Sequence, residues 1–196
     1  MRPLAETKND LSIVELANQA AWERWLDKHH EREQGVWLKF AKKASGRQTV
    51  NYAQALEIAL CYGWIDGQVA RYDELYYVQR FTPRRKRSQW SQINVDKATA
   101  LIAQNRMKPA GLRAIEQAKQ DGRWDAAYPA QSNASVPPDF EAALKENPTA
   151  KAFFETLTGS SRYAFLYRLH NTKSPDARAK RIDEYIERLS ERKTLS

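Results

Sequence analysis

The stretch WIDGQVARYDELYYVQRFT, residues 64–82, decides the fold of the N-terminal half of this chain. Aromatic and branched side chains recur along it on both sides of residues 72–73, a pattern typical of two antiparallel strands joined by a turn. Two registers are compatible with the sequence. A loop with an even number of residues would place Asp66 opposite Gln79, whereas a three-residue loop would place it opposite Arg80. The sequence therefore predicts a hairpin, with two alternative pairings for Asp66.

The segments before the hairpin complete a small mixed unit. Residues 11–16 and 36–43 have the composition and alternation of further strands, and Asn18 can cap a helix after the first of them. Asn51 opens a capping-box pattern for a second helix, which is apolar almost all round and which Gly63 can end. We therefore expect a small, mainly antiparallel sheet with flanking helices.

Beyond residue 90 the periodicity changes from that of strands to that of helices. Two helical patterns come first, followed by a stretch rich in proline and small polar residues at about 122–136, and then by four more helical segments. We expect an α+β region over 1–90 and an all-helical region over 91–196, which form either two lobes or one compact unit. The fold class predicted for the whole chain is α+β.

The composition is that of a folded protein without disulfide bonds. The 196 residues are 42% hydrophobic and include six Trp and nine Tyr, enough to form a core. Cys61 is the only cysteine, which excludes an internal disulfide. No segment approaches the ~20 apolar residues of a membrane span, and the first ten residues lack the apolar region of a signal peptide. We expect a cytoplasmic protein.

Positive charge is concentrated in the middle of the chain. The formal net charge is +8, and residues 80–123 hold 11 basic and 3 acidic side chains, while the segments on either side are balanced. A localised positive field favours an anionic partner, which could be a nucleic acid, a phosphorylated small molecule or an acidic protein. The alternative is a solvated basic surface without a partner.

The segment RFTPRRKRSQWSQIN, residues 80–94, is the densest part of this basic region. Arginine forks suit phosphate and carboxylate groups, hydroxyl groups add donors, and tryptophan rings can stack on a base or a guanidinium. We therefore predict a site for an anionic ligand that consists of Trp64, Asp66, Arg80, Thr82, Arg84, Arg85, Ser88 and Trp90. The alternative is that Arg80 pairs with Asp66 or packs along Trp64, that the tryptophans belong to the core and that the remaining cations are solvated.

Other chemistry is less well supported by the sequence. His29, His30 and His170 match no recognised metal spacing, and no dinucleotide-binding or phosphate-loop motif occurs, so we predict no metal and no cofactor. Asp66 is the strongest candidate for a general base, because a carboxylate among aromatic rings can act as one.

Three classes of function follow. The first is a non-enzymatic protein that binds an anionic ligand through residues 80–90, and nucleic acid would be favoured if the basic face is flat or convex. The second is an enzyme acting on an anionic small molecule, which requires a pocket that holds Asp66 near at least two arginines. The third is a protein-interaction module, which requires an exposed apolar patch on the helical half.

Several motifs in fixed order carry a resemblance to a known family. GVWLKFAKK, ALCYGWIDGQV, QRFTPRRKRSQWSQIN and RMKPAGLRAIEQAKQDGRWD together resemble the YdeI/OmpD-associated family of bacterial proteins. The stretch from PPDFEAALKEN to ARAKRID is similar to the bacteriocin-protection type region at the C-terminal end of that family. The resemblance implies an α+β part followed by a helical part and an indirect role in stress or bacteriocin tolerance. It brings no accepted catalytic residues.

Overall fold

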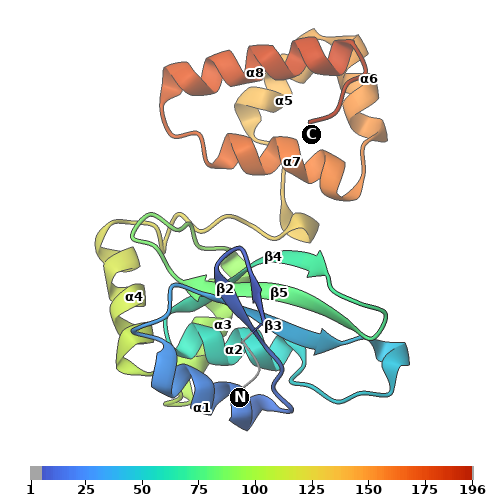
Figure 1. Cartoon of the computed structure of the whole chain (residues 1–196). Helices are drawn as coiled ribbons and strands as arrows, with labels where there is room; N and C mark the ends of the chain where they lie inside the picture. Colours follow the sequence, from blue (N-terminus) through green and yellow to red (C-terminus); the bar gives the residue numbers. More distant parts are fainter. Residues whose placement is uncertain (1–5, 196) are drawn as a thin grey trace. The chain divides into compact units, whose positions relative to one another are not determined.

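The computed structural model describes residues 6–195 and divides the chain into two compact units (Figure 1). The units are, in order, Met1–Trp90 with Asn94–Ala126 as unit 1, and Ser91–Ile93 with Ala127–Ser196 as unit 2. The division falls within the proline-rich stretch at 122–136. It groups the two helical segments after residue 90 with the sheet, whereas the sequence pattern grouped them with the helical region.

Unit 1 is built on a five-stranded sheet with strand order β1-β2-β3-β5-β4. The strands are β1 (Thr7–Lys8), β2 (Leu11–Val14), β3 (Val36–Ala41), β4 (Trp64–Arg71) and β5 (Tyr76–Pro83). Neighbouring strands are antiparallel except β2 and β3, which are parallel. The predicted α+β class, with a small and mainly antiparallel sheet in the N-terminal half, is therefore confirmed.

The helices of the N-terminal half begin where the sequence provides caps. Their bounds are α1 (Gln19–His29), α2 (Tyr52–Cys61), α3 (Gln92–Ala103) and α4 (Pro109–Gln120), with a short 3-10 helix η1 (Lys43–Ser45) before α2. The side chain of Asn18 accepts a hydrogen bond from the third residue of α1, and Asn51 forms the predicted capping box at the start of α2. Gly63 follows α2 with φ +72°, a left-handed conformation in which a Cβ would lie 2.9 Å from the carbonyl oxygen of Ala110. Glycine at this position is therefore required by both conformation and space.

The core of unit 1 lies between the sheet and helices α1 and α2. Trp22 of α1 is fully buried, contacts Phe81 edge to face at 5.6 Å and donates its indole N–H to the carbonyl oxygen of Ala55 on α2. The opposite face of the sheet is also covered at its centre. There Trp37 is fully buried and donates its indole N–H to the carbonyl oxygen of Lys8. Burial on both faces explains why β3 is apolar nearly throughout.

The hairpin between β4 and β5 has neither of the two predicted registers. Asp66 pairs with Phe81, and a bulge between Asp66 and Val69 shifts the pairing by one residue. The turn is centred further along the chain than expected, because the carboxylate of Asp73 accepts hydrogen bonds from the backbone N–H groups of Leu75 and Tyr76, both at 2.7 Å. The shifted turn and the bulge together bring Phe81, not Gln79 or Arg80, opposite Asp66.

Helix α4 packs closely against the end of α2 through a glycine. Gly111 is buried, and a Cβ on it would lie 2.2 Å from the carbonyl oxygen of Cys61, so α4 approaches α2 through this small residue. The neighbouring Leu112 is consequently turned outward and is 45% exposed, and Ile102 of α3 is 37% exposed.

The secondary structure that is described in unit 2 is all helical, as predicted for the C-terminal half. They are η2 (Gln131–Asn133), α5 (Pro138–Glu146), α6 (Pro148–Thr156), α7 (Gly159–His170) and α8 (Pro175–Ser190). Phe140, Phe154, Phe165 and Tyr185 form a buried aromatic cluster in which neighbouring rings meet edge to face. The cluster joins all four α-helices in one hydrophobic core.

An ion pair closes this helical unit at the start of α5. Arg178 of α8 donates to both carboxylate oxygens of Asp139 and also to the carbonyl oxygen of Leu169 at the end of α7. The guanidinium lowers the pKa of the Asp139 carboxyl below its ordinary value.

Among the helices of residues 6–195, none combines the length and the apolar character needed to cross a membrane.

Candidate anion-binding site

The segment after β5 is a short, tightly fixed loop. The backbone N–H of Arg84 donates to the carbonyl oxygen of Gly63 at 2.9 Å, which ties the start of the loop to the end of α2. The guanidinium carbon of Arg84 lies 3.6 Å from the ring centroid of Trp90, and one of its amino groups donates to the carbonyl oxygen of Gln89. The first and last residues of the loop are therefore held together by a cation–π stack.

The middle of the loop forms a turn that a second arginine supports. The N–H of Ser88 donates to the carbonyl oxygen of Arg85 at 2.9 Å, and the Ser88 hydroxyl accepts from the N–H of Arg85 at 3.1 Å. Arg123 donates to the carbonyl oxygen of Ser88 at 2.8 Å and is itself held by both carboxylate oxygens of Asp121. The same guanidinium lowers the pKa of Asp121. Arg123 was not predicted as part of the site, because its role depends on a contact with a residue 35 positions away.

The tip of the turn carries three consecutive exposed cations, Arg85, Lys86 and Arg87. In the part of the chain that the structure describes, none of the three has a carboxylate within ion-pair distance. The turn therefore presents a cluster of like charges on a backbone fixed by hydrogen bonds. We call residues 85–87 the basic tip.

The two tryptophans predicted as stacking platforms are both core residues. Trp64 is 1% exposed and donates its indole N–H to the carbonyl oxygen of His30. Trp90 is 2% exposed, packs against Trp124 at 4.9 Å and has an indole nitrogen that is buried without a hydrogen-bond partner. Trp90 thus stacks on a guanidinium of its own chain, and neither ring offers a face for an incoming base.

Asp66 and Arg80 lie on opposite faces of the sheet. Asp66 shares the helix-covered face with its partner Phe81, and one of its carboxylate oxygens accepts hydrogen bonds from Tyr52 at 2.9 Å and Gln79 at 3.0 Å. Burial, and then the proximity of Asp66, raises the pKa of the Tyr52 hydroxyl, so this group stays protonated and continues to donate. The arrangement fixes Asp66 within the protein and separates it from the arginines.

Arg80 and Thr82 project from the other face of β5, the side that also carries Trp37. The guanidinium of Arg80 lies against Gly67, and its Nε atom is buried without a hydrogen-bond partner. Of the eight predicted site residues, the structure thus brings together Arg84, Arg85, Ser88 and Trp90 in one loop. Arg80 and Thr82 form the strand that leads into this loop, while Trp64 and Asp66 lie on the opposite face of the sheet.

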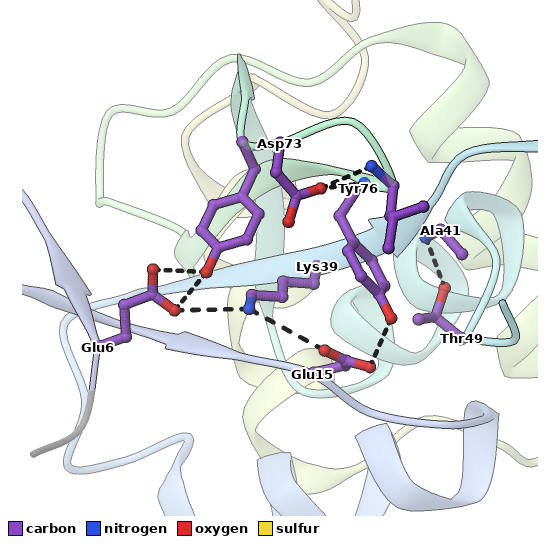
Figure 2. A network of polar contacts seen from close by, with 9 residues as sticks. Glu6, Glu15, Lys39, Ala41, Thr49, Asp73 and Tyr76 are labelled. Carbon is purple, nitrogen blue, oxygen red and sulfur yellow. Dashed lines mark hydrogen bonds and ion pairs between the residues drawn. The ribbon is translucent and has the colours of Figure 1, made fainter. Parts of the chain in front are cut away.

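A second polar cluster, which the sequence did not reveal, surrounds Lys39 (Figure 2). The Lys39 ammonium lies 3.4 Å from Glu6, 4.0 Å from Glu15 and 4.1 Å from the ring centroid of Tyr72. The hydroxyl groups of Tyr72 and Tyr76 donate to Glu6 and Glu15, respectively. The cluster joins the N-terminal strands to the hairpin between β4 and β5. Each of its charges has a partner of opposite sign, which indicates a structural role.

The described residues contain no group of three or more histidine, cysteine, aspartate or glutamate side chains placed to hold a metal ion.

The fold and the loop together define a class of protein. It has an α+β unit that presents a fixed basic turn, followed by a separate helical unit.

Comparison with known families assigns the two units separately. Residues 14–114, more than half of the chain, match the family described as a domain of unknown function (DUF8412), and the chain belongs to this family. Residues 133–192 match the family described as "Bacteriocin-protection, YdeI or OmpD-Associated", which confirms the resemblance noted in the sequence. No curated protein and no solved structure shows a significant match to the chain.

Proposed function

We propose that this chain is a non-enzymatic protein that binds an anionic polymer, a nucleic-acid backbone, through the basic tip. The observation that carries the proposal is the tip itself, with its three adjacent exposed cations and no carboxylate at ion-pair distance in the described chain. Such a field attracts phosphate groups, and arginine binds them in a bidentate manner. An indirect role in stress or bacteriocin tolerance, exerted from the cytoplasm, is part of the same proposal.

The fixed backbone of the loop supports this function. Arg84 is held by Gly63, Gln89 and Trp90, and Ser88 is held by Arg123. A ligand that contacts the tip would therefore order only the side chains, which lowers the entropic cost of binding.

The geometry favours a polymer over a small substrate. The enzyme hypothesis needs Asp66 beside at least two arginines, but Asp66 and Arg80 lie on opposite faces of the sheet. The Oδ2 atom of Asp66 accepts hydrogen bonds from two of the protein's own side chains, Tyr52 and Gln79. An exposed turn is well placed to reach the regularly spaced phosphates of a strand or duplex.

The test is a binding assay with fluorescently labelled single-stranded and duplex oligonucleotides over a series of salt concentrations. The full chain is compared with the variant Arg85→Ala/Lys86→Ala/Arg87→Ala. The logarithm of the binding constant falls with the logarithm of the salt concentration, and each phosphate contact contributes roughly 0.9 to the steepness of that line for duplex DNA. The triple variant should therefore make the line shallower by up to about 3.

The matched control removes three exposed cations from the same unit, with the variant Arg24→Ala/Lys28→Ala/Arg32→Ala. These residues are interleaved with Glu23, Asp27 and Glu31 in the sequence, so their field is balanced locally. The control should bind like the wild type. Absence of binding at low salt, or an equal loss in both variants, would contradict the proposal.

A further inference from the structure

Unit 2 contains a small cavity that the proposed function does not use. Its volume is 160 Å³, and it lies between helix α7 and the mostly irregular segment from Tyr128 to Pro137, which contains the short helix η2. Aromatic and proline rings form much of its wall, with Tyr128, Pro129 and Pro137 on one side and Tyr163, Tyr167 and His170 of α7 on the other.

The three tyrosines form one continuous aromatic wall. Tyr167 stands in the middle, at 4.8 Å and 88° to the ring of Tyr128 and at 5.8 Å and 42° to the ring of Tyr163. The hydroxyl of Tyr163 donates to the carbonyl oxygen of Pro129 at 2.9 Å, which ties α7 to the irregular segment. Burial is the main cause that raises the pKa of Tyr163 to about 12, so this hydrogen bond persists at neutral pH. The wall is therefore built from fixed side chains.

The residues around the cavity limit the charge of any occupant. None of them is a lysine, arginine, aspartate or glutamate. Apart from His170 and the faces of the tyrosine rings, the wall offers no group that could compensate a charge removed from water, so a full charge costs more to bury here than a neutral polar group. The hydroxyl of Ser135, and the acceptor capacity that the Tyr163 oxygen retains, can instead satisfy one or two neutral polar groups.

The volume limits the size of the occupant to about one ring. A protein cavity of ~150 Å³ lined by apolar side chains accommodates benzene. Aromatic rings also prefer offset or edge-to-face contact with other aromatic rings, and such contact adds to the gain from burial alone. A flat ring therefore fits these walls better than an aliphatic molecule of the same size.

From these features we infer that unit 2 binds a small, neutral, single-ring aromatic molecule that carries a hydroxyl or amino group. The ring packs against Tyr167 and its neighbours, and the polar group faces Ser135 or the Tyr163 oxygen. The inference is independent of the proposed function, because the cavity lies in unit 2 and the basic tip lies in unit 1.

Nuclear magnetic resonance of the ¹⁵N-labelled full chain tests the inference, with phenol and three matched probes. Cyclohexanol has the hydroxyl but no aromatic ring, benzoate adds a negative charge, and tetramethylammonium is a cation. Phenol should shift the backbone amide signals of residues 128–137 and of α7, with about tenfold higher affinity than cyclohexanol, benzoate or tetramethylammonium. Absence of phenol-induced shifts at these residues would overturn the inference, as would equal or tighter binding of any other probe.

A variant that fills the cavity separates specific from adventitious binding. Ala134 lines the cavity, and Ala134→Phe should abolish the phenol shifts, whereas Ala179→Phe on the exposed side of α8 should leave them unchanged. Phenol shifts that persist in Ala134→Phe would overturn the inference. If Ala134→Phe fails to fold, Tyr167→Leu gives the second test. That variant should reduce the preference for phenol over cyclohexanol, and an unchanged preference would overturn the aromatic assignment.

Discussion

Lys39 and the basic tip carry the same kind of charge within unit 1, but their surroundings differ completely. The side chain of Lys39 is only 15% exposed. Its ammonium lies between two carboxylates and near two tyrosine rings (Figure 2). Arg85, Lys86 and Arg87 are exposed and have no carboxylate at ion-pair distance in the described chain. The paired cation connects distant strands and so contributes to the fold. The side chains of the three cations at the tip make no such connection, which is why we propose that they bind a ligand.

Arg178 in unit 2 belongs to the paired type and should show the largest loss of stability. Replacing it by methionine removes hydrogen bonds to Asp139 and to the carbonyl oxygen of Leu169. Because Asp139 is 43% exposed, water compensates part of the loss, and we expect Arg178→Met to lower the free energy of unfolding of unit 2 by roughly 2 kcal/mol. Urea unfolding followed by far-ultraviolet circular dichroism measures the change.

The distribution of tryptophan makes this assay specific for each unit. All six tryptophans lie in unit 1, so their fluorescence reports the unfolding of unit 1 alone. Arg178→Met should therefore shift the part of the circular dichroism transition that comes from unit 2 to lower urea concentration. The fluorescence transition of unit 1 should stay in place. The control Lys180→Met changes an exposed cation on the same helix and should cost less than about 0.5 kcal/mol. Equal effects of the two variants would show that Arg178 does not hold α5, α7 and α8 together.

Lys39→Met should have the next largest effect, this time on unit 1. The substitution leaves Glu6 and Glu15 close together without their shared cation. Because these carboxylates are 50% and 47% exposed, we expect a loss of about 1–2 kcal/mol and not the larger cost of a fully buried pair. The midpoint of the tryptophan fluorescence transition in urea gives the value, and Lys28→Met on the exposed side of α1 is the control. A midpoint equal to that of the control would mean that the Lys39 cluster contributes nothing to stability.

The Lys39 cluster also shows where prediction from the sequence ends. Asn18, Asn51 and Gly63 act on residues within about one helical turn, so their roles could be predicted from local patterns. Lys39 meets a glutamate 33 positions earlier in the chain and a tyrosine 33 positions later, and no local pattern encodes either contact.

The candidate site was predictable to a similar extent. The run of arginines locates the basic segment, because charge density is visible in the sequence. The position of Asp66 was not predictable, since it depends on the side chain of Asp73 and on a bulge that shifts the strand by one residue. The burial of Trp64 and Trp90 likewise depends on tertiary packing against other rings.

Alkaline pH offers a milder way to weaken the Lys39 cluster. Burial alone would lower the pKa of Lys39, but the contacts with Tyr72 and Glu6 outweigh it and raise the pKa above the ordinary value of 10.5. A pKa that is raised in the folded state contributes stability below the unfolded value, and this contribution is lost as the pH rises through the folded value. Unit 1 should therefore lose stability above a pH of about 10.5 through this group.

Comparison with Lys39→Met isolates this contribution from that of other groups. The hydrogen bond to Glu6 raises the pKa of Tyr72, so the contribution of Tyr72 to the stability of unit 1 is also lost as the pH rises. The urea midpoint by tryptophan fluorescence, measured at pH 9 and at pH 11, should fall further in the wild type than in Lys39→Met. Equal falls would assign the alkaline sensitivity to other tyrosines, such as Tyr52 and Tyr62, whose pKa values are raised mainly by burial.

The smallest change in stability is expected for Arg85→Ala/Lys86→Ala/Arg87→Ala. These side chains have no carboxylate partner in the described chain, so their removal should change the free energy of unfolding by less than about 0.5 kcal/mol. A slight gain is expected at low salt, because three adjacent like charges repel one another. Tryptophan fluorescence is a direct probe, since Trp90 lies at the end of the same loop. A loss above about 1 kcal/mol would place the tip with Lys39 among the structural cations, and a loss of nucleic-acid binding in this variant would then report altered folding.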